Sequence, residues 1–205
     1  MVHTEKMKIG HLLILTFSLI TVISCQQNIG KETTSYTYFD NSISDTISTE
    51  TLTVITDEQY LEYGVRIAFI NKRNDTIIPF GKYAYYGTDT LKFYCNVFEY
   101  RNDSSLGRQI AIDRNQNILF DLVLFDNGPE PFKEGVTRVL RNGKMGYANK
   151  FGRLVIPCEY DFTTQFEKGK AKVTYNANEY LDLDGNKRFE SDEWFIIDKK
   201  GKKKE

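Results

Sequence analysis

The sequence has almost no histidine. His3 and His11 are the only two in 205 residues, and none follows residue 11. Histidine is the usual general base of serine and cysteine hydrolases and the commonest protein ligand of transition metals. Its absence from the body of the chain removes that base and that ligand, which disfavours such sites. We therefore expect no enzyme, no metal and no cofactor, and only catalysis by carboxylates alone stays open.

The chain also lacks an apolar run long enough to cross a bilayer. Its uncharged apolar stretch Leu12–Ile23 has twelve residues, whereas a transmembrane helix needs about 20. Two lysines precede this stretch, and the small residue Ser24 follows it. This order is typical of a secretory signal peptide. We therefore expect residues 1–24 to be removed.

The end of that stretch, Val22-Ile23-Ser24-Cys25, resembles the lipobox of bacterial lipoproteins. The resemblance implies that the Cys25 thiol is lipidated and becomes the first residue after cleavage. Acyl chains anchor a protein by about 0.8 kcal/mol per buried methylene. The expected location is the cell envelope, at the outer membrane, and the first expected partner is the membrane itself. The alternatives are an ordinary secreted protein with an incidental cysteine and an N-terminal anchor that is never cut.

Residues 25–53 contain few large aliphatic side chains and many Ser, Thr, Asn and Gln. Such a segment buries too little surface to fold, so we expect a flexible tether that reaches about 25–30 Å. Residues 54–205 are then one domain. Without Glu5, Lys6 and Lys8 the chain has 25 basic and 27 acidic residues. That balance offers no basic surface for nucleic acid.

Beyond the signal segment the chain has two further cysteines, Cys95 and Cys158. In an oxidising compartment these thiols are able to pair. We expect two buried free thiols, and a disulfide is the alternative.

After residue 53 the chain alternates short strands, rich in Tyr, Phe, Ile and Val, with turns. The turns share a form in which Asn or Asp follows an apolar residue and precedes two or three turn formers. An Asx side chain can bond to the backbone two residues on, so this form predicts hairpins. The five turns begin at Asn71, Asp113, Asn149, Asp182 and Asp198.

The turns belong to a repeat. Phe132-Lys133-Glu134-Gly135 recurs 34 residues later as Phe166-Glu167-Lys168-Gly169, Val139 recurs as Val173, and Gly152 aligns with Gly185 after a one-residue deletion. A period in the thirties that consists of strands predicts stacked β units. The expected fold is all-β, with antiparallel hairpin repeats stacked into one domain.

The best copy, residues 132–173, resembles the WG-repeat family. The resemblance rests on Gly143-Lys144-Met145-Gly146-Tyr147-Ala148-Asn149, Gly152, Val155-Ile156-Pro157, Tyr160-Asp161, Phe166 and Gly169. Four further segments match only in outline: Ile70–Pro79, Ile112–Phe120, Tyr180–Phe189 and Phe195–Lys202. Met145 replaces the signature Trp, and Met fills core space more softly. The resemblance implies a β-repeat module without catalytic residues.

Tyr83, Tyr85 and Tyr86 form an aromatic cluster in the least repeat-like stretch. Strand alternation places Tyr83 and Tyr85 on one face and Tyr86 on the other. Tyrosines on a sheet face are able to stack on sugars or anchor a protein partner. Core packing is the alternative, and we favour it.

Two groups of acidic residues are candidates for other chemistry. Glu130, Glu134, Glu159 and Asp161 offer a carboxylate pair for glycoside hydrolysis, although Glu159 and Asp161 flank Tyr160 in the repeat and we expect them at a surface strand end. Asp182-Leu183-Asp184-Gly185-Asn186, with Glu190 behind it, has the carboxylates and glycine of a calcium loop, although we expect a hairpin turn.

Three threonines stand in Asp-Thr-aliphatic triplets, which resemble an acceptor of bacterial O-glycosylation: Thr46, Thr76 and Thr90. Polar turns that precede strands produce the same triplet by chance, so both interpretations stay open.

The sequence therefore predicts a lipid-anchored envelope protein that binds or scaffolds, with an envelope protein or a glycan as its partner. A carboxylate-only glycosidase is the first alternative. An inhibitor or immunity-type partner of a secreted protein is the second.

Overall fold

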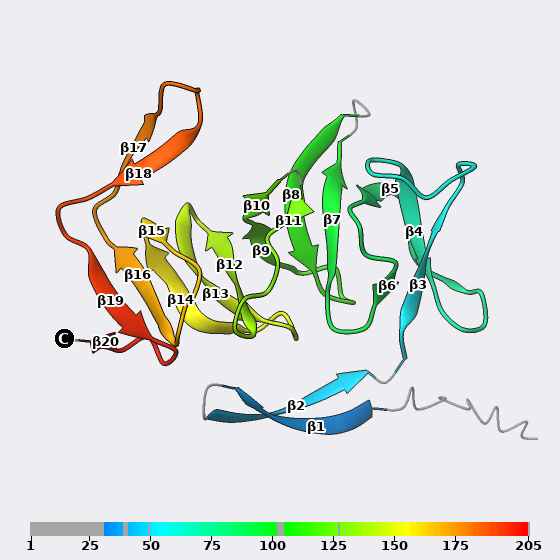
Figure 1. The fold of residues 1–205 in the computed structure, drawn as a ribbon. Coiled ribbons are helices and arrows are strands. Elements are labelled where there is room, and N and C mark those ends of the chain that lie inside the picture. Colours follow the sequence, from blue (N-terminus) through cyan, green and yellow to red (C-terminus); the bar gives the residue numbers. More distant parts are fainter. Residues whose placement is uncertain (1–30, 39–40, 49, 102–104, 127, 205) are drawn as a thin grey trace, which may run out of the picture.

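The computed structural model describes residues 31–38, 41–48, 50–101, 105–126 and 128–204, and side chains from residue 50 onward within these ranges. These residues contain strands and no helix (Figure 1), which confirms the all-β prediction. The strands are β1 (Lys31–Tyr38), β2 (Asn41–Ser48), β3 (Leu52–Thr56), β4 (Arg66–Ile70), β5 (Thr76–Tyr85), β6 (Thr90–Leu91), β7 (Cys95–Tyr100), β8 (Leu106–Ile112), β9 (Ile118–Leu122), β10 (Leu124–Phe125), β11 (Gly128–Pro129), β12 (Val136–Arg141), β13 (Lys144–Asn149), β14 (Leu154–Tyr160), β15 (Phe162–Thr163), β16 (Lys170–Thr174), β17 (Asn178–Leu181), β18 (Lys187–Glu190), β19 (Phe195–Asp198) and β20 (Lys203–Lys204).

One antiparallel sheet of ten strands runs through most of the protein, in the order β14-β13-β12-β9-β8-β7-β5-β4-β3-β6. A four-stranded sheet follows toward the C-terminus, in the order β15-β16-β19-β20. Neighbours in these sheets are mostly consecutive in the chain, as expected for a series of hairpins. The hairpins β1-β2, β10-β11 and β17-β18 are separate two-stranded pairs.

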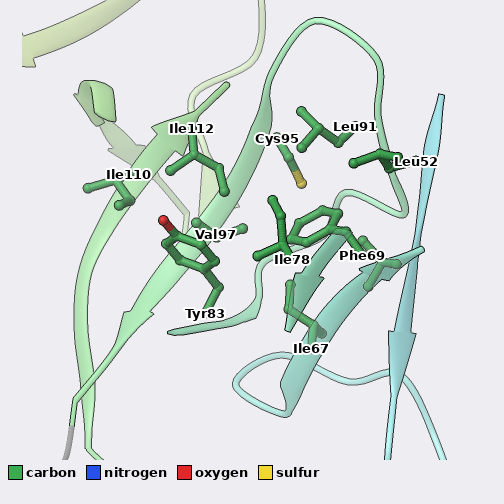
Figure 2. Close-up of a cluster of buried hydrophobic side chains, with 11 residues drawn as sticks. Leu52, Ile67, Phe69, Ile78, Tyr83, Leu91, Cys95, Val97, Ile110 and Ile112 are labelled. Carbon is green, nitrogen blue, oxygen red and sulfur yellow. The ribbon is translucent and has the colours of Figure 1, made fainter. Parts of the chain in front are cut away.

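The N-terminal part of the large sheet curves around one apolar cluster, which Figure 2 shows. Its side chains occur at alternate positions along the strands, as in Ile67 and Phe69 or Ile110 and Ile112. Alternation by two places such residues on one face of a strand. Side chains from six strands, β3 to β8, therefore close into one core.

The five Asx turns have one common geometry. In each, the Asn or Asp side-chain oxygen accepts hydrogen bonds from the backbone N–H groups two and four residues later. The first carbonyl accepts the N–H of the fourth residue. That fourth residue has a positive φ in every case: Asn74, Gln116, Gly152, Gly185 and Gly201. All five predicted turns are confirmed.

Strand pairing identifies two copies of the WG-type unit. The first is β12-β13-β14, in which Val139 pairs with Gly146. The second is β16-β19-β20, in which Val173 pairs with Phe195. Asp198 then stands where Asn149 stands in the first copy, so the equivalent of Gly152 is Gly201.

This register corrects the alignment of Gly152 with Gly185. In the first copy, only Asn142 and Gly143 join the two paired strands. In the second, residues 175–194 lie between them and include the β17-β18 hairpin, which projects from the body (Figure 1). The turn at Asp182 belongs to this inserted hairpin, so the segments Tyr180–Phe189 and Phe195–Lys202 are not two further copies.

The two copies share a core. Tyr147 of β13 packs with Phe166 (ring centroids 4.8 Å apart), and Val173 and Ile197 of the second copy complete the cluster. Each unit thus buries its apolar face on the next, as stacked repeats do.

The segment expected to be a tether overlaps with strands. The hairpin β1-β2 pairs Lys31 with Ser48, and Leu52 of β3 is already fully buried in the first cluster. The domain core therefore begins before residue 54, because Leu52 and Val54 alternate into the same core.

Candidate functional site

A groove of about 540 Å³ lies in the second copy, between the end of β14 and the strands β19 and β20. A volume of that size is typical of ligand-binding sites. Four of the eight residues that line it are aromatic: Tyr160, Tyr175, Trp194 and Phe195.

Three of these rings form one packed group. The ring centroids of Tyr160 and Tyr175 are 5.0 Å apart, those of Tyr175 and Phe195 are 5.4 Å apart, and those of Tyr160 and Phe195 are 6.2 Å apart. Tyr160 is buried at the base of the group, whereas Tyr175 is 53% exposed. The group therefore presents an aromatic surface to the solvent on a buried support.

The two copies differ at the position of Gly146. In the first copy β14 passes directly over Gly146, where an added Cβ would lie 2.6 Å from the carbonyl oxygens of Ile156 and Pro157. Phe195 occupies the matching position in the second copy. Its ring lines the groove, and β20 pairs with Ile196 and Ile197.

Trp194 stands at the position of Met145, which is the signature Trp position of the repeat. It lies edge-on to Phe162, with centroids 6.0 Å apart, and Phe162 stacks on Phe189 of the inserted hairpin at 4.3 Å. The Nζ atom of Lys172 lies 4.8 Å from the Trp194 ring centroid. These contacts fix the half-buried indole at the rim of the groove.

The groove also carries charged side chains, namely Glu159, Glu193 and Lys203. The Tyr175 hydroxyl donates a hydrogen bond to Oε1 of Glu159 (3.2 Å). The Lys203 ammonium lies 5.1 Å from the centroid of the Phe195 ring. Burial raises the pKa of Tyr160 above its usual value, and the nearby Tyr175 and Glu159 raise it further. The hydroxyl of Tyr160 is therefore neutral and able to form hydrogen bonds at physiological pH.

The candidate aromatic face of Tyr83, Tyr85 and Tyr86 does not form an exposed surface. Tyr83 is buried in the first cluster, where Figure 2 shows its ring among Val97, Ile110 and Ile112. Tyr86 is 2% exposed and packs on Phe98. Core packing, the favoured alternative, explains both positions.

Tyr85 is half-buried, and its hydroxyl donates a hydrogen bond to the carboxylate of Asp89. Burial and this hydrogen bond raise the pKa of Tyr85 to about 12. The hydroxyl of Tyr85 therefore binds a residue four positions along the chain.

The four candidate carboxylates each have their own partner. Glu130 is buried and bonds to the guanidinium of Arg138, whose Nη1 also donates to the Thr163 carbonyl (2.7 Å). The other three bond elsewhere: Glu134 accepts the Gly169 N–H and pairs with Lys199, Asp161 pairs with Lys144, and Glu159 accepts the Tyr175 hydroxyl. Three of the four therefore connect elements of the repeat, and only Glu159 lines the aromatic groove.

The candidate calcium loop is a hairpin turn. The Asp182 carboxylate accepts the N–H groups of Asp184 and Asn186 and pairs with Arg188 at 2.8 Å. These hydrogen bonds hold the pKa of Asp182 below its usual value. The part of the chain that the structure describes contains no cluster of three or more side chains suited to a metal ion.

The remaining predicted residues lie apart from the groove. Cys95 is buried and Cys158 partly buried, and both thiols are free. Burial raises the pKa of Cys95 to about 12. Thr76 and Thr90 are exposed at the starts of β5 and β6. The side chain of Thr46 and all of Cys25 lie outside the described residues.

Sequence reasoning missed Tyr175, Trp194 and Phe195. The available signal was the single Trp of the chain, followed directly by Phe195 and preceded by Glu193. In the described residues we find no helix that is long and apolar enough to span a membrane.

Residues 145–178 match the model of a family described as the WG containing repeat. The match begins at Met145 and includes two rings of the groove, Tyr160 and Tyr175. No curated protein and no solved structure matches the chain. The chain therefore contains a WG-type β-repeat, as its motif predicted.

Proposed function

We propose that this protein is a lipid-anchored component of the cell envelope that binds a partner through the aromatic groove of its second WG-type copy. The observation that carries the binding role is the open group of rings formed by Tyr160, Tyr175 and Phe195. Aromatic side chains with a polar end are enriched where proteins bind partners. The lipobox-like residues before Cys25 support the anchor.

The anchor is tested by Cys25→Ser in the native host. We expect the variant to lose label from a radioactive fatty acid and to leave the membrane fraction. A variant that keeps its N-terminal segment and still sediments with membranes would refute the lipoprotein assignment.

The binding role is tested by cross-linking and recovery of the full-length protein from envelope extract. Tyr175→Ala removes an exposed ring from the groove, and Tyr60→Ala removes one that is similarly exposed and lies far along the chain. We expect Tyr175→Ala to abolish recovery of the partner and Tyr60→Ala to leave it unchanged. Equal recovery with both variants would place the binding site elsewhere.

A hydrolase is the second candidate, because Glu159 and Glu193 line the same groove. Glycosidases use two carboxyl groups about 5–9.5 Å apart. New reducing ends released from an envelope polysaccharide, and abolished in both Glu159→Gln and Glu193→Gln, would favour this function over binding alone.

A further inference from the structure

The groove is lined by two exposed glutamates, Glu159 and Glu193. Three acidic residues in this part of the chain are in ion pairs, namely Asp161 with Lys144, Asp182 with Arg188 and Asp198 with Lys204. Within the described ranges, Glu159 and Glu193 have no such cationic partner. Glu159 accepts only the hydroxyl of Tyr175. Two carboxylates therefore lie beside the aromatic rings outside ion-pair distance of a cation, and the ammonium of Lys203 lines the same groove.

The rings at this site already hold cations from the chain itself. The Lys203 ammonium lies over Phe195, and the Lys172 ammonium lies over Trp194, at 5.1 and 4.8 Å from the ring centroids. A cation over an aromatic face is attracted by the negative charge density of that face. The geometry of the groove thus suits an ammonium group.

We propose that the groove binds an alkylammonium group, which the rings of Tyr175 and Phe195 receive and the carboxylates of Glu159 and Glu193 neutralise. This inference rests on the proposed binding role of the groove and names the chemistry of its ligand. A neutral sugar would gain the stacking contacts but would leave both carboxylates uncompensated.

Lys203 acts as an internal occupant of the site. Its side chain lines the groove from β20, the edge strand of its sheet, and its ammonium takes the place over Phe195 that a ligand would need. A bound ammonium group displaces it. Removal of the Lys203 charge therefore strengthens binding of a cation, whereas it would weaken binding of an anion.

Trp194 is the only tryptophan of the chain and lies at the groove, so its fluorescence reports on the site directly. The full-length protein, purified in detergent, is titrated with choline and with 3,3-dimethyl-1-butanol, which has the same shape without the charge. Calorimetry gives a second readout. We expect a saturable response to choline and at least about a tenfold weaker one to the neutral alcohol.

Variants with unchanged circular dichroism define the site. We expect Glu159→Gln and Glu193→Gln each to weaken choline binding about fivefold and Lys203→Met to strengthen it by a similar factor. Glu190→Gln, on the inserted hairpin outside the groove, is the matched control and leaves binding unchanged. N-acetyl-lysine methylamide is titrated in parallel. Tighter binding of this compound assigns the ammonium group to a protein side chain, and tighter binding of choline assigns it to a small metabolite.

Equal responses to choline and its neutral isostere, no response in either readout, or weaker choline binding in Lys203→Met would each overturn the inference. The broader binding role has a separate test. If Tyr175→Ala abolishes recovery of a partner while choline does not bind, the groove binds a ligand of another class.

Discussion

The two copies of the WG-type unit have the same strand register but differ in how closely their strands pack. In the first, Gly146 lets β14 cross directly over β13, and the unit closes around Met145 and Tyr147. In the second, Phe195 takes the place of that glycine and lines the groove. The same position therefore holds a glycine beneath a strand in one copy and an aromatic ring at a groove in the other. The comparison teaches that one strand register can present two different surfaces.

The sharpest way to break the comparison is to give the first copy the residue of the second. In Gly146→Phe the new Cβ meets backbone atoms of Ile156, Pro157 and Cys158 at 2.6–2.7 Å, and backbone cannot move aside as a side-chain end can. We expect a loss of more than about 4 kcal/mol, which belongs to the severe class of substitutions. Urea unfolding followed by circular dichroism measures it. A stability within 1 kcal/mol of the parent, on the order of ordinary surface changes, would show that β14 does not cross over Gly146.

The residues beside this glycine provide the next test. Met145 is 8% exposed, and the Thr163 hydroxyl lies 3.9 Å from its sulfur atom. We expect Met145→Ala to cost about 2–3 kcal/mol, near the lower end for buried methionine because a small part of it is exposed. The matched change Trp194→Ala removes a larger but only half-buried side chain and should cost less per atom removed. Thermal unfolding of both variants tests the order, and a larger loss per atom for Trp194→Ala would contradict the assignment of the closed and open copies.

The equivalent turns of the two copies differ in their crowding. Gly152 and Gly201 both have φ of 75°, where a Cβ costs about 1–2 kcal/mol. At Gly152 the new Cβ would also meet the Leu119 Cδ1 atom at 2.9 Å and the Tyr94 ring at 3.0 Å, whereas at Gly201 the nearest atom, of Ile156, is 3.6 Å away.

We therefore expect Gly152→Ala to destabilise the protein by about 2 kcal/mol or more and Gly201→Ala by only about 1 kcal/mol. Both are measured by urea unfolding under one set of conditions. Equal losses would mean that the first copy is no more tightly packed than the second around its turn.

The sequence was most informative where the interactions are local. Each Asx turn is formed by hydrogen bonds within five consecutive residues, so a short motif such as that at Asn149 specifies it completely. The closing Gly152 follows from the same local geometry. Period-two alternation also placed Tyr83 and Tyr86 on opposite faces, and both are in the core because each face of that strand is covered.

The insertion was beyond local reasoning. Asp182 begins the same kind of turn as Asp198, so in the sequence the inserted hairpin resembles the strand pair that continues the repeat. Only the pairing of Val173 with Phe195 shows that β19, and not the inserted hairpin, continues the second copy. The groove was missed for a related reason. Its rings come from three separate segments, at Tyr160, at Tyr175 and at Trp194-Phe195, which no local pattern brings together.

The smallest expected difference concerns charge at the turn. Asn149 and Asp198 occupy equivalent positions, so only the second copy titrates there. Burial raises the pKa of Asp198, but the backbone N–H groups of Lys202 and Lys200 and the ammonium of Lys204 lower it more, and the pKa lies below its usual value. A carboxylate with a lowered folded-state pKa contributes stability above its unfolded pKa of about 4 and loses it as the pH falls through the folded value.

We expect Asp198→Asn to be slightly less stable than the parent at pH 7. The new amide preserves the turn, as the amide of Asn149 does in the first copy, but it carries no charge. The difference between the two proteins should shrink to nothing near pH 2. Urea unfolding of both proteins at several pH values isolates this contribution from the other carboxylates, since those are common to the pair. A difference that stays constant with pH would mean that the Asp198 charge does not stabilise the second copy.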